Sequence, residues 1–533
     1  MLEEVKNIVE VVRADNEIRF LFNGAKGADY HAGYVFFGRE FVMGAGPADF
    51  TCEYGYSYPF NMVAFYNETQ AVLVIIDEPD FKSIHLHKDH MVCYCDFRFS
   101  TSAEKVQFQL KSFPADKHFL TDMIKEYRAW FTEKFGSLPE SGRDLSGCFN
   151  VKRYFFNRSE KFFGTYYEAP GAVFDGGKIR LKELIEEDYA QLGGVDAALL
   201  FDYAFKDGIR CGNREPFPFE NLKLAELNNM MADIRKEHKI GFWAYFDPCF
   251  IEYGSYWDRK FRKSLALHTD NDQPASIWGE NVWNPDLGSE AWQEECGDYL
   301  QDVINGLNVE GIYLDEIGNG TQFKGQIQGK AYDQINAESR FVDHMQRRIN
   351  TKKWMCEYPP VAKEAVKFNI VLSDTRTLVN IYRFIFPRLK FVRVINCDIP
   401  IGNNTEELNK ALFNGEGIWL DHDVNDRQWY PDKLKRTIRE HTQFKKKYAA
   451  YLESSDAEHY WNNKEGVAVN RYGFSGRDLY IAINENCKPV RFELHIERAD
   501  KARVVLGGDC FFEQFGNKAT FQIPSHSVCA VVN

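Results

Sequence analysis

Between residues 145 and 450, short apolar segments alternate with segments of helical periodicity, and this alternation constrains the fold more than any other feature of the chain. Parallel strands that are joined by crossover helices produce such a pattern. Eight of them over roughly 300 residues predict a closed (β/α)8 barrel. The expected strands are 148–156, 196–203, 240–247, 311–315, 353–357, 368–374, 379–386 and 417–421. The expected helices are 181–192, 222–238, 290–307, 332–349 and 432–449.

The stretch from 357 to 390 departs from this regular pattern. Its connections are too short to contain full helices between the expected strands. We therefore expect the second half of the barrel to be irregular.

The segments on either side of the barrel have a different character. Residues 1 to about 112 contain short strand-like runs that are broken by Gly, Asn, Asp and Pro, which favours an antiparallel sandwich. Phe119, Met123, Tyr127 and Trp130 then repeat at helical spacing, and strand-like runs return after residue 456. We predict a β-sandwich at 1–115, a linker helix at 116–144, the barrel at 145–452 and a small β-sandwich at 453–533.

Composition limits the partners and the compartment. The net charge of −13 argues against nucleic acid as a partner, because a polyanion would be repelled. The start of the chain lacks the features of a signal peptide, and no segment reaches about 18 consecutive apolar residues, so no membrane partner is expected. The 12 cysteines are scattered between Cys52 and Cys529, which is typical of reduced thiols and predicts a cytoplasmic protein.

The segment from Gly311 to Gly318 is the best candidate for an active-site strand end. A short apolar run there stops abruptly at Asp315 and Glu316. Alternate residues of a strand face the same side, so Tyr313 and Asp315 share one face while Ile312 and Leu314 suit packing against helices. Asp315 is therefore expected to point into the barrel mouth, where a buried acid needs a functional reason.

Other expected strands also end in acids. Two carboxyl groups at one barrel face suit cleavage of a glycosidic bond, because one attacks or activates water while the other protonates the leaving oxygen. Further acids could bind sugar hydroxyls, although each alone could instead cap a loop or the next helix. The acids at the remaining strand ends are Asp202, Asp247, Glu357, Asp374 and Asp421.

Three motifs together resemble a known group of barrel enzymes. They are Tyr127-Arg128-Ala129-Trp130-Phe131, the run from Asn284 to Trp292, and the run from Gly311 to Asp315. Over residues 120 to 450 the chain resembles the endo-α-N-acetylgalactosaminidases and, more distantly, the α-galactosidase and α-amylase clans of retaining glycosidases. The resemblance implies a (β/α)8 barrel with flanking sandwiches and a weak preference for galacto-configured sugars.

The resemblance also implies roles for three acids. Asp315 corresponds to the nucleophile at the end of the fourth strand. Glu357 fits the acid/base of the galactosaminidase and amylase-like pattern, and Asp374 fits that of the α-galactosidase pattern. The chain lacks the histidine and arginine motif of the amylases, and Tyr313 stands where α-galactosidases carry a lysine two residues before the nucleophile. Both departures leave the sugar specificity open.

The remaining candidate site residues would bind the substrate. For the tryptophans, core packing is at least an equal alternative. Candidates for hydroxyl contacts are Asp202, Asp247, Arg383 and Asp421, and candidates for sugar stacking are Trp243, Trp283 and Trp419. No cofactor or metal is expected.

These observations predict a hydrolase of carbohydrate metabolism that cleaves an α-glycosidic bond in an oligosaccharide or small glycoside. Asp315 and Glu357 would act by a retaining mechanism. Alternatives are a transglycosylase or inverting glycosidase on the same barrel, or a non-catalytic carbohydrate-binding protein. The oligomeric state is not indicated by any pattern in the chain.

Overall fold

The structure is a computed structural model of the whole chain. It describes residues 8–533 except 23–32, 40, 56, 79–80, 91, 101, 117, 143–144, 157–158, 163–164, 169–172, 176, 202–222, 277–281, 319–324, 352, 374–377, 396–403, 421–430, 461–465, 497–501, 508–509 and 517.

Two five-stranded antiparallel sheets form the N-terminal β-sandwich. In β2, Ile18, Phe20 and Phe22 are buried between the sheets, as alternating apolar residues predict. One sheet has the order β1 (Val9–Ala14), β2 (Glu17–Phe22), β9 (Cys93–Arg98), β8 (Ser83–Lys88) and β5 (Ala48–Glu53). The other has the order β10 (Phe108–Pro114), β7 (Gln70–Ile76), β6 (Met62–Tyr66), β3 (Gly33–Phe37) and β4 (Phe41–Gly44).

Helix α2 (Phe119–Phe135) covers the outer face of the second sheet. Strand β7 is buried along both of its faces, because one faces the sandwich core and the other faces α2. The buried stripe of α2 includes Met123, Tyr127, Trp130 and Phe131, and the helix ends at Gly136, whose φ is 86°. The helix predicted from these same residues is confirmed.

Eight parallel strands close into a barrel, so the predicted (β/α)8 fold is confirmed. The last strand pairs with the first, which leaves no free edge. The strands are β11 (Asn150–Phe155), β16 (Ala197–Phe201), β17 (Gly241–Phe246), β20 (Gly311–Leu314), β23 (Lys353–Cys356), β24 (Ile370–Ser373), β25 (Lys390–Ile395) and β26 (Gly417–Leu420). The helices of the barrel region are α3 (Leu181–Leu192), α4 (Leu224–His238), α5 (Tyr256–Leu265), α6 (Glu290–Gly306), α7 (Gln334–Arg348), α8 (Ile381–Ile385), α9 (Asn404–Phe413), α10 (Asp432–Lys447) and α11 (Ala449–Leu452).

The prediction of a seventh strand at 379–386 is wrong. That segment contains the short helix α8, and the seventh strand is β25. Asn380 begins the helix, because its side chain accepts a hydrogen bond from the backbone N–H of Arg383 at 3.2 Å. All five residues of α8 are buried, so the segment has no polar face that would distinguish a helix from a strand.

The C-terminal region is a smaller β-sandwich, as predicted. Its core includes Val469, Tyr480, Phe521 and Val531 from both sheets. One sheet has the order β27 (Ala457–Tyr460), β28 (Val467–Phe474), β29 (Arg477–Asn484), β34 (Ser527–Val532) and β31 (Arg503–Leu506). The other contains β30 (Val490–His495), β33 (Lys518–Ile523) and β32 (Phe511–Phe515). The domain limits at residues 115, 144 and 452 stay predictions.

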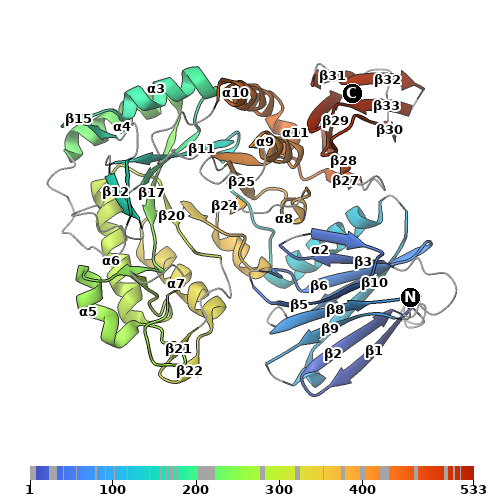
Figure 1. Cartoon of the computed structure of the whole chain (residues 1–533), viewed down its shortest axis with the longest axis horizontal. Coiled ribbons are helices and arrows are strands. Elements are labelled where there is room, and N and C mark those ends of the chain that lie inside the picture. The colour runs from blue at the N-terminus through green and yellow to red at the C-terminus, as the bar shows by residue number, and fades with distance from the viewer. Residues whose placement is uncertain are drawn as a thin grey trace.

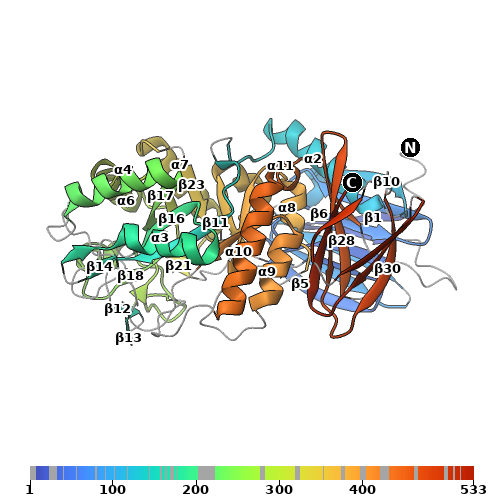
Figure 2. The same cartoon turned by 90° about the horizontal axis from the view of Figure 1, so that it is seen from above.

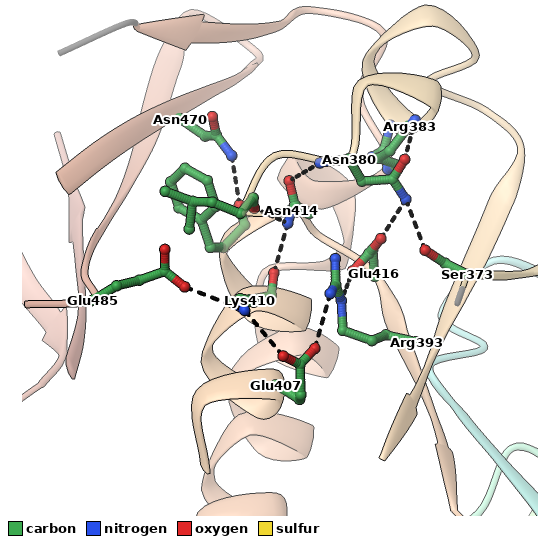
Figure 3. A network of polar contacts seen from close by, with 12 residues as sticks. Ser373, Asn380, Arg383, Arg393, Glu407, Lys410, Asn414, Glu416, Asn470 and Glu485 are labelled. Atoms are coloured by element: carbon green, nitrogen blue, oxygen red, sulfur yellow. Dashed lines mark hydrogen bonds and ion pairs between the residues drawn. The ribbon is translucent and has the colours of Figure 1, made fainter. Parts of the chain in front are cut away.

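Both groups of sheets lie on the same side of the barrel (Figure 1). Helices α9 and α10 stand between the barrel and the C-terminal sheets (Figure 2). Polar contacts cross this boundary (Figure 3): Lys410 of α9 pairs with Glu485 at 3.3 Å, and the Asn470 amide donates to the Phe413 carbonyl at 2.8 Å. Among the helices of the described residues, none is long and apolar enough to cross a membrane.

Candidate active site

Asp315 follows β20 directly, at the carboxyl end of the barrel. Its backbone N–H donates to the Phe246 carbonyl at 2.9 Å, which fixes it beside the end of β17. At the other end of β20, a Cβ on Gly311 would lie 2.4 Å from the Trp243 ring, so only glycine leaves room for that ring inside the barrel. The β20 residues that alternate with Asp315 therefore face the barrel interior.

Two tyrosines hold the Asp315 carboxylate. The Tyr313 hydroxyl donates to Oδ1 at 2.8 Å, and the Tyr245 hydroxyl donates to Oδ2 at 2.7 Å. The two tyrosines are paired residues of neighbouring strands, and both are buried. Each carboxylate oxygen thus has a hydroxyl donor, and a carboxylate that accepts two such hydrogen bonds is fixed in orientation.

Glu357 lies beside Asp315, at the end of the neighbouring strand β23. Its Oε2 accepts a hydrogen bond from the backbone N–H of Glu316 at 2.7 Å. Burial and the negative charges of Asp315 and Glu316 raise the pKa of Glu357 well above its usual value, and a hydrogen bond with the Asp315 side chain raises it further. The Glu316 N–H opposes this shift without reversing it. The surroundings of Glu357 therefore favour its protonated form beside Asp315.

The turns after β20 and β23 are joined by backbone contacts. The Tyr358 N–H donates to the Ile317 carbonyl at 3.1 Å. Gly318 has a φ of 97°, and a Cβ there would lie 2.2 Å from the Tyr358 carbonyl oxygen. Glycine is required at this position for both reasons. The close approach of these turns keeps Asp315 and Glu357 together.

Asp247 lies near this pair, after β17. It is 6% exposed, and its Oδ1 accepts a hydrogen bond from the backbone N–H of Cys249 at 2.9 Å. This contact is the loop-capping interaction that its sequence position also allowed. A role in binding substrate hydroxyls stays a prediction.

The structure does not place two of the predicted stacking tryptophans where a sugar could reach them. Trp243 and Trp283 are both 0% exposed. Trp243 fills the barrel interior over Gly311, and the Trp283 indole N–H donates to Asp258 at 2.9 Å. Both tryptophans belong to the packed core, so the stacking prediction for them is wrong. Trp419 is 4% exposed and packs against the Tyr313 ring, with 5.2 Å between ring centroids.

Arg383 does not join the acid pair, and its predicted contact with substrate is wrong. It belongs to α8, where its Nη1 donates to the Pro387 carbonyl at 2.8 Å and its Nη2 donates to the Leu452 carbonyl. It was assigned to the barrel mouth because the segment was expected to be a strand. Helix α8 instead carries it to the opposite end of the barrel.

Three predicted site residues, Asp202, Asp374 and Asp421, lie outside the described residues.

Two features of the site were not predicted from the sequence. The first is the pair of tyrosine hydroxyls on Asp315, for which the signal was Tyr313 two residues before the acid on the same strand face. The second is Arg153 on β11, whose guanidinium lies over the Phe155 and Phe201 rings at 5.1 and 4.8 Å. Phe201 in turn packs against Tyr245. Its signal was a second basic residue, next to Lys152, inside a predicted barrel strand.

No cluster of three or more histidine, cysteine or acidic side chains suited to a metal ion is present among the described residues. The side chains around Asp315 offer carboxyl, hydroxyl and guanidinium groups, which suit acid–base and nucleophilic chemistry.

Several solved structures share this architecture. A GH36 α-galactosidase from Geobacillus stearothermophilus, solved in complex with stachyose, is 11% identical with a TM-score of 0.60, and the match covers 97% of this chain and 79% of that one. An α-N-acetylgalactosaminidase from Bifidobacterium bifidum, solved with GalNAc, is 11% identical with a TM-score of 0.62, covering 88% and 81%. A cycloalternan-degrading enzyme from Trueperella pyogenes is 10% identical with a TM-score of 0.61, covering 97% and 81%.

No protein-family model matches the chain, and no curated protein matches it in sequence. The chain has the fold of these (β/α)8 glycoside hydrolases, with β-sandwiches at both ends of the sequence. The fold that the sequence motifs implied is confirmed, whereas activity is a separate question because one barrel hosts many chemistries.

Proposed function

We propose that the protein is a glycoside hydrolase that cleaves an α-glycosidic bond with retention, with Asp315 as the nucleophile and Glu357 as the acid/base. The observation that carries the proposal is the hydrogen-bonded contact between these two side chains at the carboxyl ends of adjacent strands, where the pKa of Glu357 is raised. Pairs of carboxyl groups in unlike environments are the signature of acid and nucleophile roles.

In the first step, Asp315 attacks the anomeric carbon while the bond from that carbon to the glycosidic oxygen breaks. Glu357 gives its proton to the departing oxygen. Asp315 is then an ester and carries no charge, which removes one cause of the raised pKa of Glu357. In the second step, Glu357 takes a proton from water as the water oxygen attacks the anomeric carbon and releases Asp315.

The direct contact between the carboxyl groups favours retention over inversion. Retaining pairs stand about 5–5.5 Å apart, whereas inverting pairs leave about 6.5–9.5 Å for a water molecule. A sugar that enters between Asp315 and Glu357 would replace their hydrogen bond. Asp374 stays the alternative acid/base, as the α-galactosidase pattern suggests.

For the substrate, we propose a small glycoside or oligosaccharide with a weak preference for galacto-configured sugars. The support is that similar structures are an α-galactosidase and an α-N-acetylgalactosaminidase. Asp202, Asp247 and Asp421 stay proposed as contacts to sugar hydroxyls, and Arg153 is a further candidate. A cytoplasmic location, predicted from the cysteines, would limit substrates to small imported sugars.

The test is chromophore release from a panel of aryl α- and β-glycosides. We expect wild type to cleave at least one α-glycoside, and Asp315→Asn to lose activity by orders of magnitude. Asp302→Asn, on the exposed surface of α6, is the matched control and should keep full activity. Cleavage that survives in Asp315→Asn would reject the proposed nucleophile. A wild type that cleaves only β-glycosides would reject the proposed bond specificity.

A further inference from the structure

A cavity of about 360 Å³ lies at the end of the barrel opposite to Asp315. Two lining residues show this position: Lys390 begins β25 and Gly415 just precedes β26, so the cavity lies at the amino ends of these strands. The walls come from four parts of the chain: the segment before β11, the segment from α8 to β25, Gly415 before β26, and the end of α11 with Glu453. Charged side chains in the lining are Glu140, Arg383, Arg388, Lys390 and Glu453.

Arg383 is a buried cation in this wall without a carboxylate partner among the described residues. It is 3% exposed. Its hydrogen bonds go to two backbone carbonyls, those of Pro387 and Leu452. A guanidinium has five N–H donors, so three remain for a further acceptor. Burial lowers the pKa of Arg383, and the nearby Tyr472, Glu416 and Glu453 offset this shift only in part.

The two carboxylates in the lining are already bound to other groups. Glu453 Oε1 accepts from the Lys390 ammonium and from the Gly147 N–H at 2.7 Å, and Oε2 accepts from the Ser146 hydroxyl at 2.6 Å. Glu140 pairs with Arg388 at 3.6 Å on the exposed rim, where such pairs are weak. Three cations and two anions line the cavity. Lys390 and Arg388 pair with the two carboxylates, so Arg383 is the cation in the lining without a carboxylate partner in the described part of the chain.

A second buried cation lies near this wall. Lys445 of α10 is 1% exposed, and its ammonium has no hydrogen-bond partner among the described residues. Burial lowers the pKa of Lys445 to about 7, with help from the charges of Lys390 and Arg393 and against those of Glu416 and Asp196. Lys445 is therefore a further buried basic group beside the cavity.

We propose that the cavity is a binding site for a small oxyanion of the phosphate or carboxylate class, with Arg383 and Arg388 as its ligands. The planar fork of a guanidinium matches the oxygens of both anions. Arg383 would bind from the buried wall, and Arg388, with 66% of its side chain exposed, from the rim. An anion here would neutralise the buried charge of Arg383 and so stabilise the fold, independently of the glycosidase activity.

The experiment measures binding of inorganic phosphate, sulfate and citrate to the full chain by calorimetry and by the shift in Tm. Chloride at matched ionic strength separates specific binding from screening. Two variants test the ligands: Arg388→Ala removes a mostly exposed side chain and should fold, and Arg383→Gln removes the buried charge. Arg347→Ala, on the exposed surface of α7, is the matched control.

We expect saturable binding of at least one oxyanion to wild type and to Arg347→Ala. Binding should weaken about tenfold or more in Arg388→Ala, since one charge-assisted hydrogen bond contributes about 1.5–3 kcal/mol. Preference for phosphate over citrate would identify the ligand class as phosphate, and the reverse as carboxylate. The proposal is overturned when no oxyanion binds saturably, which means a water-filled cavity, or when Arg388→Ala binds as tightly as Arg347→Ala.

Discussion

At the scale of single residues, the chemistry of the site depends on the setting of Asp315. The direction in which the Asp315 side chain points could be predicted from strand alternation, because Tyr313 and Asp315 share a face of β20. The hydrogen bond from Tyr245 could not be predicted, because it depends on the register between β17 and β20. Arg153 was missed for the same reason, since its contact with Phe201 depends on the register between β11 and β16.

Removing either hydroxyl donor should impair catalysis more than folding. We expect Tyr313→Phe to lower kcat about tenfold or more, because a hydrogen bond to a charged group contributes about 1.5–3 kcal/mol, with little change in KM. Steady-state kinetics on the best aryl glycoside measures this split. Tyr189→Phe is the matched control, because the Tyr189 hydroxyl lies 3.2 Å from the Val195 and His238 carbonyl oxygens and shares its one proton between them. Equal kcat values for the Tyr313→Phe variant and wild type would show that the hydroxyl does not position Asp315.

Glu357 should make stability depend on pH. Its pKa is raised in the folded state, so its contribution is fully present below about pH 4.5 and is lost as pH rises through the folded pKa. We therefore expect the Tm of Glu357→Gln to exceed that of wild type increasingly as pH rises above 4.5. Thermal melts over a pH series measure this, with Glu133→Gln on α2 as the exposed control. A Tm difference independent of pH would contradict the raised pKa.

At the scale of elements, the barrel shows where sequence patterns succeed and fail. Strands β20 and β23 were predicted because their apolar runs end sharply in acids. Strand β25 was missed because it contains Lys390 and Arg393, which look like surface residues in the sequence. Arg393 is nonetheless buried, since its guanidinium pairs with Glu416 at 2.6 Å. A long-range ion pair of this kind leaves no local signal.

The turn after β20 offers a test of how the backbone supports the site. We expect Gly318→Ala to destabilise the fold by about 1–3 kcal/mol, because the position combines a positive φ with a close approach to Tyr358. It should also lower kcat, because the clash would push apart the two turns that hold Asp315 and Glu357. Denaturant unfolding and kinetics measure both effects. Gly46→Ala, where a Cβ meets no atom within 4 Å, should be neutral in both assays. A Gly318→Ala variant as stable as Gly46→Ala would contradict this reading of the turn.

At the scale of the whole molecule, the three-part order of sandwich, barrel and sandwich could be read from the alternation of patterns along the chain. The way the parts are joined could not, because it depends on contacts between distant residues. The Arg128 guanidinium, for example, donates to the Ile385 carbonyl of α8 at 3.2 Å and to the Ser455 carbonyl at 3.3 Å. It therefore ties α2 to α8 and to the segment that precedes the C-terminal sheets.

The buried ion pair of Arg393 and Glu416 links β25 to the residues just before β26 and should stabilise the fold (Figure 3). Glu416 is 0% exposed and also accepts a hydrogen bond from the Asn380 amide. We expect Glu416→Ala to cost about 3–5 kcal/mol, because it leaves Arg393 buried without that partner. Chemical denaturation measures the loss. The double variant Arg393→Met/Glu416→Leu should lose much less, and an equal loss in both would contradict the ion-pair explanation.

The most direct test of the central claim is to trap the covalent intermediate on Asp315. A 5-fluoro glycosyl fluoride of the sugar that the aryl glycoside panel identifies would be incubated with the full-length enzyme, and the labelled peptide would be identified by mass spectrometry. If Asp315 is the nucleophile, we expect a single sugar adduct on the peptide that contains Asp315, and none in Asp315→Asn. An adduct on another acid, or turnover of the same sugar with inversion at the anomeric carbon, would contradict it.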